Sequence, residues 1–312
     1  MPSVTVIIST YTKARSRYVL ACIDSLRSQT LDPEEILLVL DPDEELRKFY
    51  TSLVPDCVLI VDSGGRGLSN ARNSGVTMAS GEIVAFIDDD ATADRNWLRN
   101  LVDKYRDSDV VGVGGLIIPV WENGRPSWFP EELDWIVGCS YKGLPETETR
   151  VRNPIGCNMS FRRDVFQKVG NFKASFGRFG GKLLGSEEAE FSIRLLRKCP
   201  NSKIIFDPNA VVYHKIPRTR KTLSYFAKRS FYEGISKGLL ESLEPKASDT
   251  LSVERMYFSH LLRFSISLRL RRIYEPKYFV QLLAILLSLF LVASGYLISD
   301  LVANLYAGRR SR

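Results

Sequence analysis

Residues 83–90 read Ile-Val-Ala-Phe-Ile-Asp-Asp-Asp, so an apolar run ends abruptly in three carboxylates. The run has the length of a buried strand. Adjacent carboxylates at a strand end repel one another and lose solvation, and a bound cation removes that conflict. Hard oxygen ligands suit Mg²⁺ or Mn²⁺, and these ions leave coordination positions for substrate phosphates. The segment therefore predicts a metal–phosphate site at the carboxyl end of a strand. The alternative is an acidic turn or a helix cap.

Short apolar runs alternate with helical patterns along the first half of the chain. The predicted strands are residues 4–8, 36–40, 58–61, 83–87 and 110–117, and helical spacing recurs at residues 19–29, 68–79 and 92–105. This alternation predicts an α/β fold with a mostly parallel sheet flanked by helices. The carboxyl ends of parallel strands share one edge of the sheet, so the polar residues that follow these strands should converge there. They are Thr10, Tyr11, Asp41, Asp88, Asp89 and Asp90.

The pattern changes after the fifth predicted strand. Gly112, Gly114 and Gly115 in this strand indicate a bulge or the close approach of another backbone. Residues 119–153 mix aromatic residues with prolines, which predicts a long functional loop or a partly helical insertion. Helical periodicity returns at residues 161–169 and 187–198, and short strands are expected at residues 203–206 and 210–213.

The C-terminal part has the composition of a membrane-associated region. Residues 278–299 carry no charged side chain and are long enough to cross a bilayer, although a buried hairpin or core helix is the alternative. Residues 255–273 combine five arginines with repeated apolar residues, which predicts an amphipathic helix on the membrane surface. Basic residues flank the apolar segment, and the positive-inside bias favours a single-pass protein of the cell membrane with its N-terminal part in the cytoplasm. The expected regions are a catalytic domain at 1–217, a basic amphipathic region at 218–277, a transmembrane helix at 278–300 and a basic tail at 301–312.

The charge distribution supports the same division. The net charge is +7, and lysine and arginine gather after about residue 194. Because the basic residues cluster beside the apolar segment, we expect anionic lipid or phosphate as partners and no nucleic acid. Five scattered cysteines without a Cys-x-x-Cys pair predict reduced, buried thiols instead of a zinc site or a disulfide framework.

Five segments in order resemble family 2 glycosyltransferases, which have the Rossmann-like GT-A fold. They are Val-Thr-Val-Ile-Ile-Ser-Thr-Tyr at 4–11, Gly-Leu-Ser-Asn-Ala-Arg-Asn-Ser-Gly at 67–75, the acidic strand end at 81–90, an acceptor-side segment at 153–170, and Gly-Ser-Glu-Glu-Ala-Glu-Phe-Ser-Ile-Arg at 185–194. The similarity covers roughly residues 3–215. It implies transfer of a sugar from a UDP-sugar with the help of Mg²⁺ or Mn²⁺.

The resemblance also implies roles for individual residues. Thr10 and Tyr11 would border the nucleobase and the ribose, and Asp41 would pair with the base. The further residues expected at the nucleotide-sugar are Arg15, Arg72, Asn73, Asp88 and Asp89, and those expected at the metal are Asp90, Asp88 and His214. An arginine at position 72 can neutralise the diphosphate, whereas its alternative is a surface helix residue. In related enzymes a histidine near the position of His214 can contact the metal or the diphosphate, whereas a lone histidine is more often structural.

The resemblance places the catalytic base at Glu188, where the family usually has aspartate. A carboxylate there would take a proton from the acceptor hydroxyl while the sugar C1 is attacked opposite the departing diphosphate, which inverts the anomeric centre. Because glutamate is one carbon longer than aspartate, Glu187 remains a second candidate. The alternative for both residues is a pair of acids that stabilise a helix N-terminus.

The acceptor is predicted from a second resemblance. Residues 128–135 are similar to a segment of archaeal membrane glycosyltransferases that extend dolichyl-phosphate sugars, including glucuronosyltransferases. Exposed Trp128, Phe129 and Trp135 could hold lipid or a sugar ring, with core aromatics as the alternative, and Asn158 is also expected on the acceptor side. Arg152, Arg162 and Arg163 are candidates for binding a uronic-acid carboxylate. Alternative functions are transfer to bare polyprenyl phosphate, extension of a surface polysaccharide, or a non-catalytic nucleotide-sugar-binding scaffold.

Overall fold

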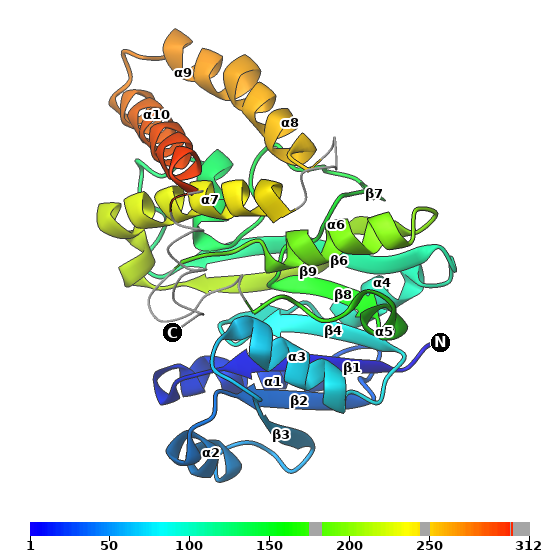
Figure 1. The fold of residues 1–312 in the computed structure, drawn as a ribbon. Helices are drawn as coiled ribbons and strands as arrows, with labels where there is room; N and C mark the ends of the chain where they lie inside the picture. The colour runs from blue at the N-terminus through cyan, green and yellow to red at the C-terminus, as the bar shows by residue number, and fades with distance from the viewer. Residues whose placement is uncertain (175–182, 244–249, 300, 302–312) are drawn as a thin grey trace. The chain divides into compact units, whose positions relative to one another are not determined.

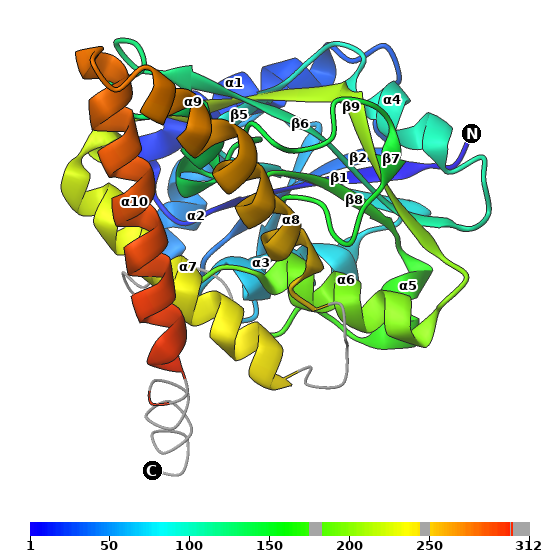
Figure 2. The same ribbon diagram turned by 90° about the horizontal axis from the view of Figure 1, so that it is seen from above.

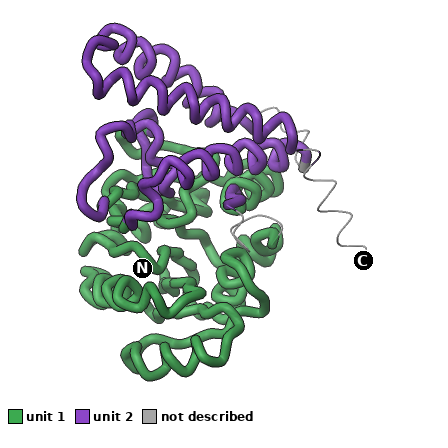
Figure 3. The backbone as a smooth tube through the Cα atoms, turned by 90° about the vertical axis from the view of Figure 1, so that its left-hand side faces the viewer, with its two compact units in different colours: residues 1–120, 145–180, 187–215 green, residues 121–144, 181–186, 216–312 purple. Residues whose placement is uncertain are grey.

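The structure is a computed structural model, and it describes residues 1–174, 183–243, 250–299 and 301. The chain divides into two compact units (Figure 3). Unit 1 comprises residues 1–120, 145–180 and 187–215, and unit 2 comprises residues 121–144, 181–186 and 216–312. The expected boundary after residue 217 lies next to this division, whereas residues 121–144 group with the C-terminal helices.

Unit 1 is built on one mixed sheet, which Figure 1 shows with its helices. The strands are β1 (Val4–Thr10), β2 (Glu35–Leu40), β3 (Val58–Asp62), β4 (Ile83–Asp88), β5 (Ala91–Ala93), β6 (Val110–Trp121), β7 (Thr149–Arg150), β8 (Asn158–Arg162) and β9 (Lys203–Ile216). Their order is β3-β2-β1-β4-β8-β6-β9-β5, and β7 pairs with β9. The α/β class with flanking helices is confirmed. β3, β2, β1 and β4 are parallel, and β8 then pairs antiparallel with β4, so the sheet is mixed.

The helices of unit 1 bury apolar stripes against this sheet. They are α1 (Ser16–Arg27), α2 (Glu44–Thr51), α3 (Leu68–Met78), α4 (Trp97–Lys104), α5 (Asp164–Val169) and α6 (Glu187–Lys198). In α1 the buried residues are Val19, Cys22, Ile23 and Leu26, the spacing of a helix with one apolar face. The α2 helix begins after Asp43, whose side chain accepts a hydrogen bond from the Leu46 amide.

Three local predictions are wrong in detail. The helix expected from residue 92 begins only at Trp97, because residues 91–93 form β5 and pair with β9. The helical pattern at residues 161–169 is divided between the end of β8 and the short α5. The two strands expected at 203–206 and 210–213 are one strand, β9, which continues through Pro208. The Asp207 side chain accepts a hydrogen bond from the Asn209 amide there. Periodicity along the chain does not show which distant strand supplies the hydrogen-bond partners.

Close backbone contact explains the glycines of β6. A Cβ on Gly115 would lie 1.9 Å from the carbonyl oxygen of Ala210 in β9. The predicted close approach is therefore confirmed, and it allows β6 to lie directly against the strand that carries His214. All five cysteines are free thiols, but the predicted burial is wrong for Cys57, which is exposed.

Unit 2 contains α7 (Leu223–Leu243), α8 (Ser252–His260), a π-helical turn (Leu261–Ile266), α9 (Ser267–Arg271) and α10 (Pro276–Leu297). Short 3-10 helices cover Glu131–Val137 and Arg218–Lys221. The expected helix at residues 255–273 is confirmed as the run from α8 to α9, with exposed apolar residues such as Phe264 and Leu270. Among the described residues, α10 is the one helix long and apolar enough to cross a membrane, and 33% of its most apolar window is buried.

The α10 helix packs along α7 through small residues (Figure 2). A Cβ on Gly234 would lie 2.0 Å from the Val292 carbonyl oxygen, and one on Gly295 would lie 2.1 Å from that of Phe231. The hydroxyls of Ser230 and Ser288 are 3.2 Å apart. These contacts resemble the small-residue packing that brings helices together in membranes. One side of α10 is therefore covered by α7, while Leu283 and Leu286 remain exposed.

Candidate active site

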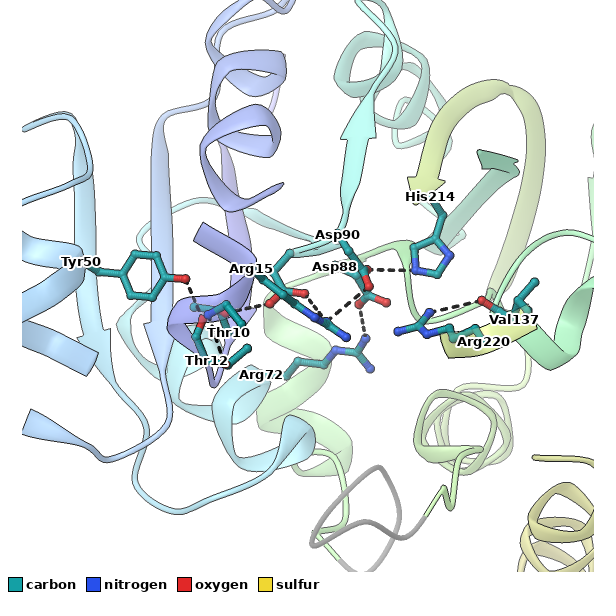
Figure 4. Close-up of polar contacts among 12 residues, drawn as sticks. Thr10, Thr12, Arg15, Tyr50, Arg72, Asp88, Asp90, Val137, His214 and Arg220 are labelled. Atoms are coloured by element: carbon teal, nitrogen blue, oxygen red, sulfur yellow. Dashed lines mark hydrogen bonds and ion pairs between the residues drawn. The ribbon is translucent and has the colours of Figure 1, made fainter. Parts of the chain in front are cut away.

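The carboxyl ends of the parallel strands bring several predicted site residues together in unit 1 (Figure 4). Thr10 at the end of β1 donates a hydrogen bond of 2.6 Å from Oγ1 to Asp89 Oδ2. The Asp41 amide, just past β2, donates to the Thr10 carbonyl oxygen at 3.2 Å. Ser9 and Asp88 are neighbours in the register of β1 and β4. The predicted convergence of these strand ends is confirmed.

The three carboxylates after β4 have different partners. Arg15 donates from Nη1 to Asp89 Oδ1 at 2.7 Å and lies 3.3 Å from Asp90 Oδ2. His214 Nε2 lies 2.9 Å from Asp90 Oδ1. Asp88 is the most exposed of the three, with 29% of its side chain accessible, against 3% for Asp89 and 4% for Asp90. The triplet is therefore an organised polar centre and not a solvated acidic turn.

Burial raises the pKa of Asp89 to about 6, although the Arg15 guanidinium opposes the shift. The neighbouring Asp90 raises it further, because two adjacent carboxylates resist ionising together. A positive charge near this centre would stabilise the ionised forms. Arg15 supplies one such charge, and a bound cation would supply another.

Side chains at the end of β4 and within β9 could hold that cation. Asp88 ends β4, Asp90 follows it, and His214 lies in β9 opposite Ala91. Carboxylate oxygens and an imidazole nitrogen suit Mn²⁺, and the oxygens suit Mg²⁺. Cys157 joins the group, since one ligand atom each from Asp88, Cys157 and His214 lie within 4.8 Å of one another. Sequence reasoning missed Cys157.

Arg72 links this centre to the start of α6. It is buried, and its Nη1 donates to Glu187 Oε1 at 2.9 Å. Its Nη2 donates to the Gly156 carbonyl oxygen at 2.9 Å and lies 3.3 Å from Asp88 Oδ1. Arg72 is thus a buried bridge, so its surface-helix alternative is wrong.

The residues before and after Glu187 complete the α6 N-terminus. Ser186 has a φ of +74°, a left-handed conformation that is uncommon for a residue with a side chain. Such backbone strain often occurs at functional sites. Glu188 is half-buried in the first turn of α6. The ion pair with Arg72 holds the buried carboxylate of Glu187 in place.

Two expected binding residues use their side chains within the fold. The Asn73 amide donates to the Phe172 carbonyl oxygen at 2.9 Å and accepts from the Phe172 amide at 3.0 Å. Asn158 is fully buried, and its Nδ2 donates to two backbone carbonyl oxygens while its Oδ1 accepts from Trp97 Nε1 at 2.8 Å. The structure does not bring these two amides to the acidic centre.

The residues predicted to border the nucleobase directly follow β1 and β2. Tyr11 is 62% exposed, and the Arg15 guanidinium lies 5.5 Å from its ring centre. Asp41 is half-buried and accepts from the Gly67 amide at 3.2 Å. Burial raises the pKa of Asp41 above its ordinary value, against the effect of this hydrogen bond.

Two arginines considered for a uronic acid lie at the other end of the sheet. Arg162 pairs with Ile83 at the start of β4, whereas the acidic residues follow its end. Arg162 donates to the carbonyl oxygens of Val110 and Tyr105, and Arg163 donates to that of Ala79. The β4 strand places roughly 17 Å between its ends, so these arginines do not reach the acidic centre.

The aromatic residues expected on the acceptor side lie in unit 2. Phe129 is fully buried, so its predicted exposure is wrong, and it packs edge-on against Phe226 at 5.7 Å between ring centres. Trp128 is half-buried and lies 5.4 Å from the same ring. Trp135 is half-buried and donates from Nε1 to the Tyr257 hydroxyl at 3.1 Å. Core packing therefore accounts for much of this aromatic segment.

Comparisons with known proteins agree with this fold. The family described as "Glycosyl transferase family 2" matches residues 5–170. A glucosyl-dolichyl phosphate glucuronosyltransferase of Haloferax volcanii is 35% identical over 309 residues, which cover 97% of each chain. The mannosyltransferase PcManGT from Pyrobaculum calidifontis, solved with GDP-Man and Mn²⁺, has a TM-score of 0.60 at 18% identity and covers 98% of this chain and 88% of its own. GalNAc-T7, solved with UDP, GalNAc and Mn²⁺, has a TM-score of 0.52 at 18% identity and covers 86% of this chain and 57% of its own. At these identities the solved structures show the fold alone.

Proposed function

This chain belongs to glycosyltransferase family 2, and we propose that it transfers a sugar from a UDP-sugar, with inversion, to a dolichyl- or polyprenyl-phosphate-linked sugar. That it is a glycosyltransferase follows from the family. The observation that carries the finer proposal is the 35% identity to a glucosyl-dolichyl phosphate glucuronosyltransferase along 97% of both chains. UDP-glucuronic acid and a glucosyl-lipid phosphate are accordingly the first donor and acceptor to test.

On the donor side, we assign the nucleotide to the strand ends of β1 and β2. Tyr11 and Asp41 would contact the ribose and the base, and their exposed or half-buried positions leave them accessible. Arg15 is held by Asp89 beside Tyr11, where a guanidinium can neutralise a diphosphate. Thr10 is buried and would act by fixing Asp89. Arg72 would act mainly by positioning Asp88 and Glu187.

A divalent ion fits the acidic centre, and Asp88, Asp90 and His214 would hold it. When bound, such an ion offsets the negative charge of a departing diphosphate. His214 Nε2 contacts Asp90 Oδ1, and a cation beside these groups would oppose the burial and the Asp90 charge that raise the pKa of Asp89. The two solved neighbours contain Mn²⁺, which supports the same assignment.

Glu188 is our candidate for the base that accepts the proton of the acceptor hydroxyl. It lies in the first turn of α6, next to Glu187. Arg72 contacts both Glu187 and Asp88. A positioned carboxylate of this kind contributes roughly 10²–10⁴-fold to a transfer rate. Glu187 is the weaker candidate, because a guanidinium already holds its carboxylate.

The decisive test is an assay with the full chain in detergent. We expect radiolabelled UDP-glucuronic acid to label glucosyl-dolichyl phosphate, with transfer lost in EDTA and restored by Mn²⁺. Matched reactions should use other UDP-sugars and bare dolichyl phosphate. Labelling of the bare lipid phosphate alone would favour a different acceptor, and nucleotide binding without any transfer would contradict the proposal.

We further propose that unit 2 attaches the enzyme to the membrane through a single α10 span, with the catalytic part on the cytoplasmic side. The exposed Leu283 and Leu286 lie in the middle of α10. Replacing both with arginine should raise the free energy of membrane insertion by about 5–7 kcal/mol, because each arginine costs about 2.5–3.5 kcal/mol at the centre of a membrane helix. The double variant should move from the carbonate-washed membrane fraction to the supernatant.

The matched control is Leu59→Arg, which replaces an exposed leucine of β3 in unit 1. This variant should stay with the membrane like the wild type. A double variant that also resists the carbonate wash would show that α10 does not anchor the chain.

A further inference from the structure

The strand register brings an unassigned thiol to the acidic centre. The β8 strand runs antiparallel to β4, with Asn158 opposite Ile87. The next residues outward, Cys157 and Asp88, are therefore neighbours at the adjoining strand ends. On the β5–β9 pair, His214 lies opposite Ala91. Three strands that are distant in sequence thus supply a thiol, a carboxylate and an imidazole.

These groups are close enough to share one ion. Their ligand atoms all lie within 4.8 Å of one another. Donors on opposite sides of one metal ion are about 4–5 Å apart, because metal–ligand bonds measure about 2.0–2.3 Å. Cys157 is 4% exposed and His214 is 1% exposed, so both side chains are largely shielded from bulk water.

We propose that Cys157 is a direct ligand of the metal ion, together with Asp88 and His214. The inference rests on the metal-dependent transfer proposed above and adds the class of ion that the site takes. A thiolate is a soft ligand that favours later first-row ions, whereas Mg²⁺ prefers oxygen ligands. The thiolate therefore shifts the preference of the site from Mg²⁺ toward Co²⁺, and Co²⁺ binds it more tightly than Mn²⁺ does.

Cobalt absorption gives a test that does not depend on activity. Titration of the reduced full chain in detergent with Co²⁺ should produce a thiolate-to-cobalt charge-transfer band in the near ultraviolet. Cys157→Ser should lose this band. It should also weaken Mn²⁺ binding by at least about tenfold in calorimetry, because even outer-shell partners are worth 10–100-fold in metal affinity.

The matched control is Cys22→Ser. Cys22 is fully buried in α1 and also lies within electrostatic range of Asp88, Asp89 and Asp90, so it tests for a band from a nearby core thiol. The control should keep the band. X-ray absorption of the cobalt-loaded wild type should show one sulfur neighbour, a result that holds even where a variant folds poorly.

The outcomes separate this inference from the proposed function. A wild type that binds Co²⁺ without sulfur ligation, or a band that survives in Cys157→Ser, overturns the role of Cys157 and leaves metal-dependent transfer intact. A sulfur-ligated cobalt site in a chain that transfers no sugar overturns the proposed function and leaves the ligand assignment standing.

Discussion

Asp90→Asn is expected to lower kcat for sugar transfer by about 10²–10³-fold, the loss that follows removal of one preorganised electrostatic group. Asp90 is buried, contacts His214 Nε2 at 2.9 Å and lies 3.3 Å from Arg15. The amide has the same shape as the carboxylate and can still hydrogen-bond, so the fold should remain. It lacks the charge that a divalent ion needs. Initial rates at saturating Mn²⁺, donor and acceptor would measure the effect.

The control for Asp90 is Asp62→Asn. Asp62 ends β3, another parallel strand of the same sheet, but its side chain is half exposed and pairs with Arg47 on the surface. Exposed ion pairs contribute little, about 0–1 kcal/mol, so the control should keep wild-type rates and stability. Near-wild-type transfer by Asp90→Asn, with metal dependence retained, would remove Asp90 from the metal site.

Several features of the site follow from sequence because they depend on local patterns. The acidic triplet after the apolar run, and the polar residues after β1 and β2, converge because parallel strands end at one edge. The bounds of α6 also agree with its helical spacing at residues 187–198. In each case one segment of chain contains the whole signal.

The features that sequence reasoning missed depend on long-range antiparallel pairing. Cys157 reaches Asp88 only because β8 pairs with β4 in one particular register. A shift of one residue would turn its side chain to the other face of the sheet. Asn158 and Asn73 have the residue type of a binding site, yet distant backbone groups use their amides. Residue type alone does not reveal such partners.

Substitution of the two glutamates at the start of α6 should have different effects, on the transfer rate for Glu188 and on stability for Glu187. Glu188→Gln should lower kcat by about 10²–10⁴-fold, because an amide cannot accept the acceptor's proton. Its stability should change by less than about 1 kcal/mol, since Glu188 is only half-buried. Glu188→Asp restores the residue usual in the family and should retain much of the rate.

Glu187→Gln should instead act mainly on stability. Its carboxylate is 6% exposed and pairs with Arg72, which is 3% exposed. Breaking a buried ion pair costs about 3–5 kcal/mol. We expect a loss of about 3 kcal/mol in the free energy of unfolding, because Arg72 keeps its contacts with Asp88 and the Gly156 carbonyl oxygen. Denaturant unfolding and initial rates on the same preparations would measure both effects. A large loss of rate in Glu187→Gln at wild-type stability, with active Glu188→Gln, would assign the base to Glu187.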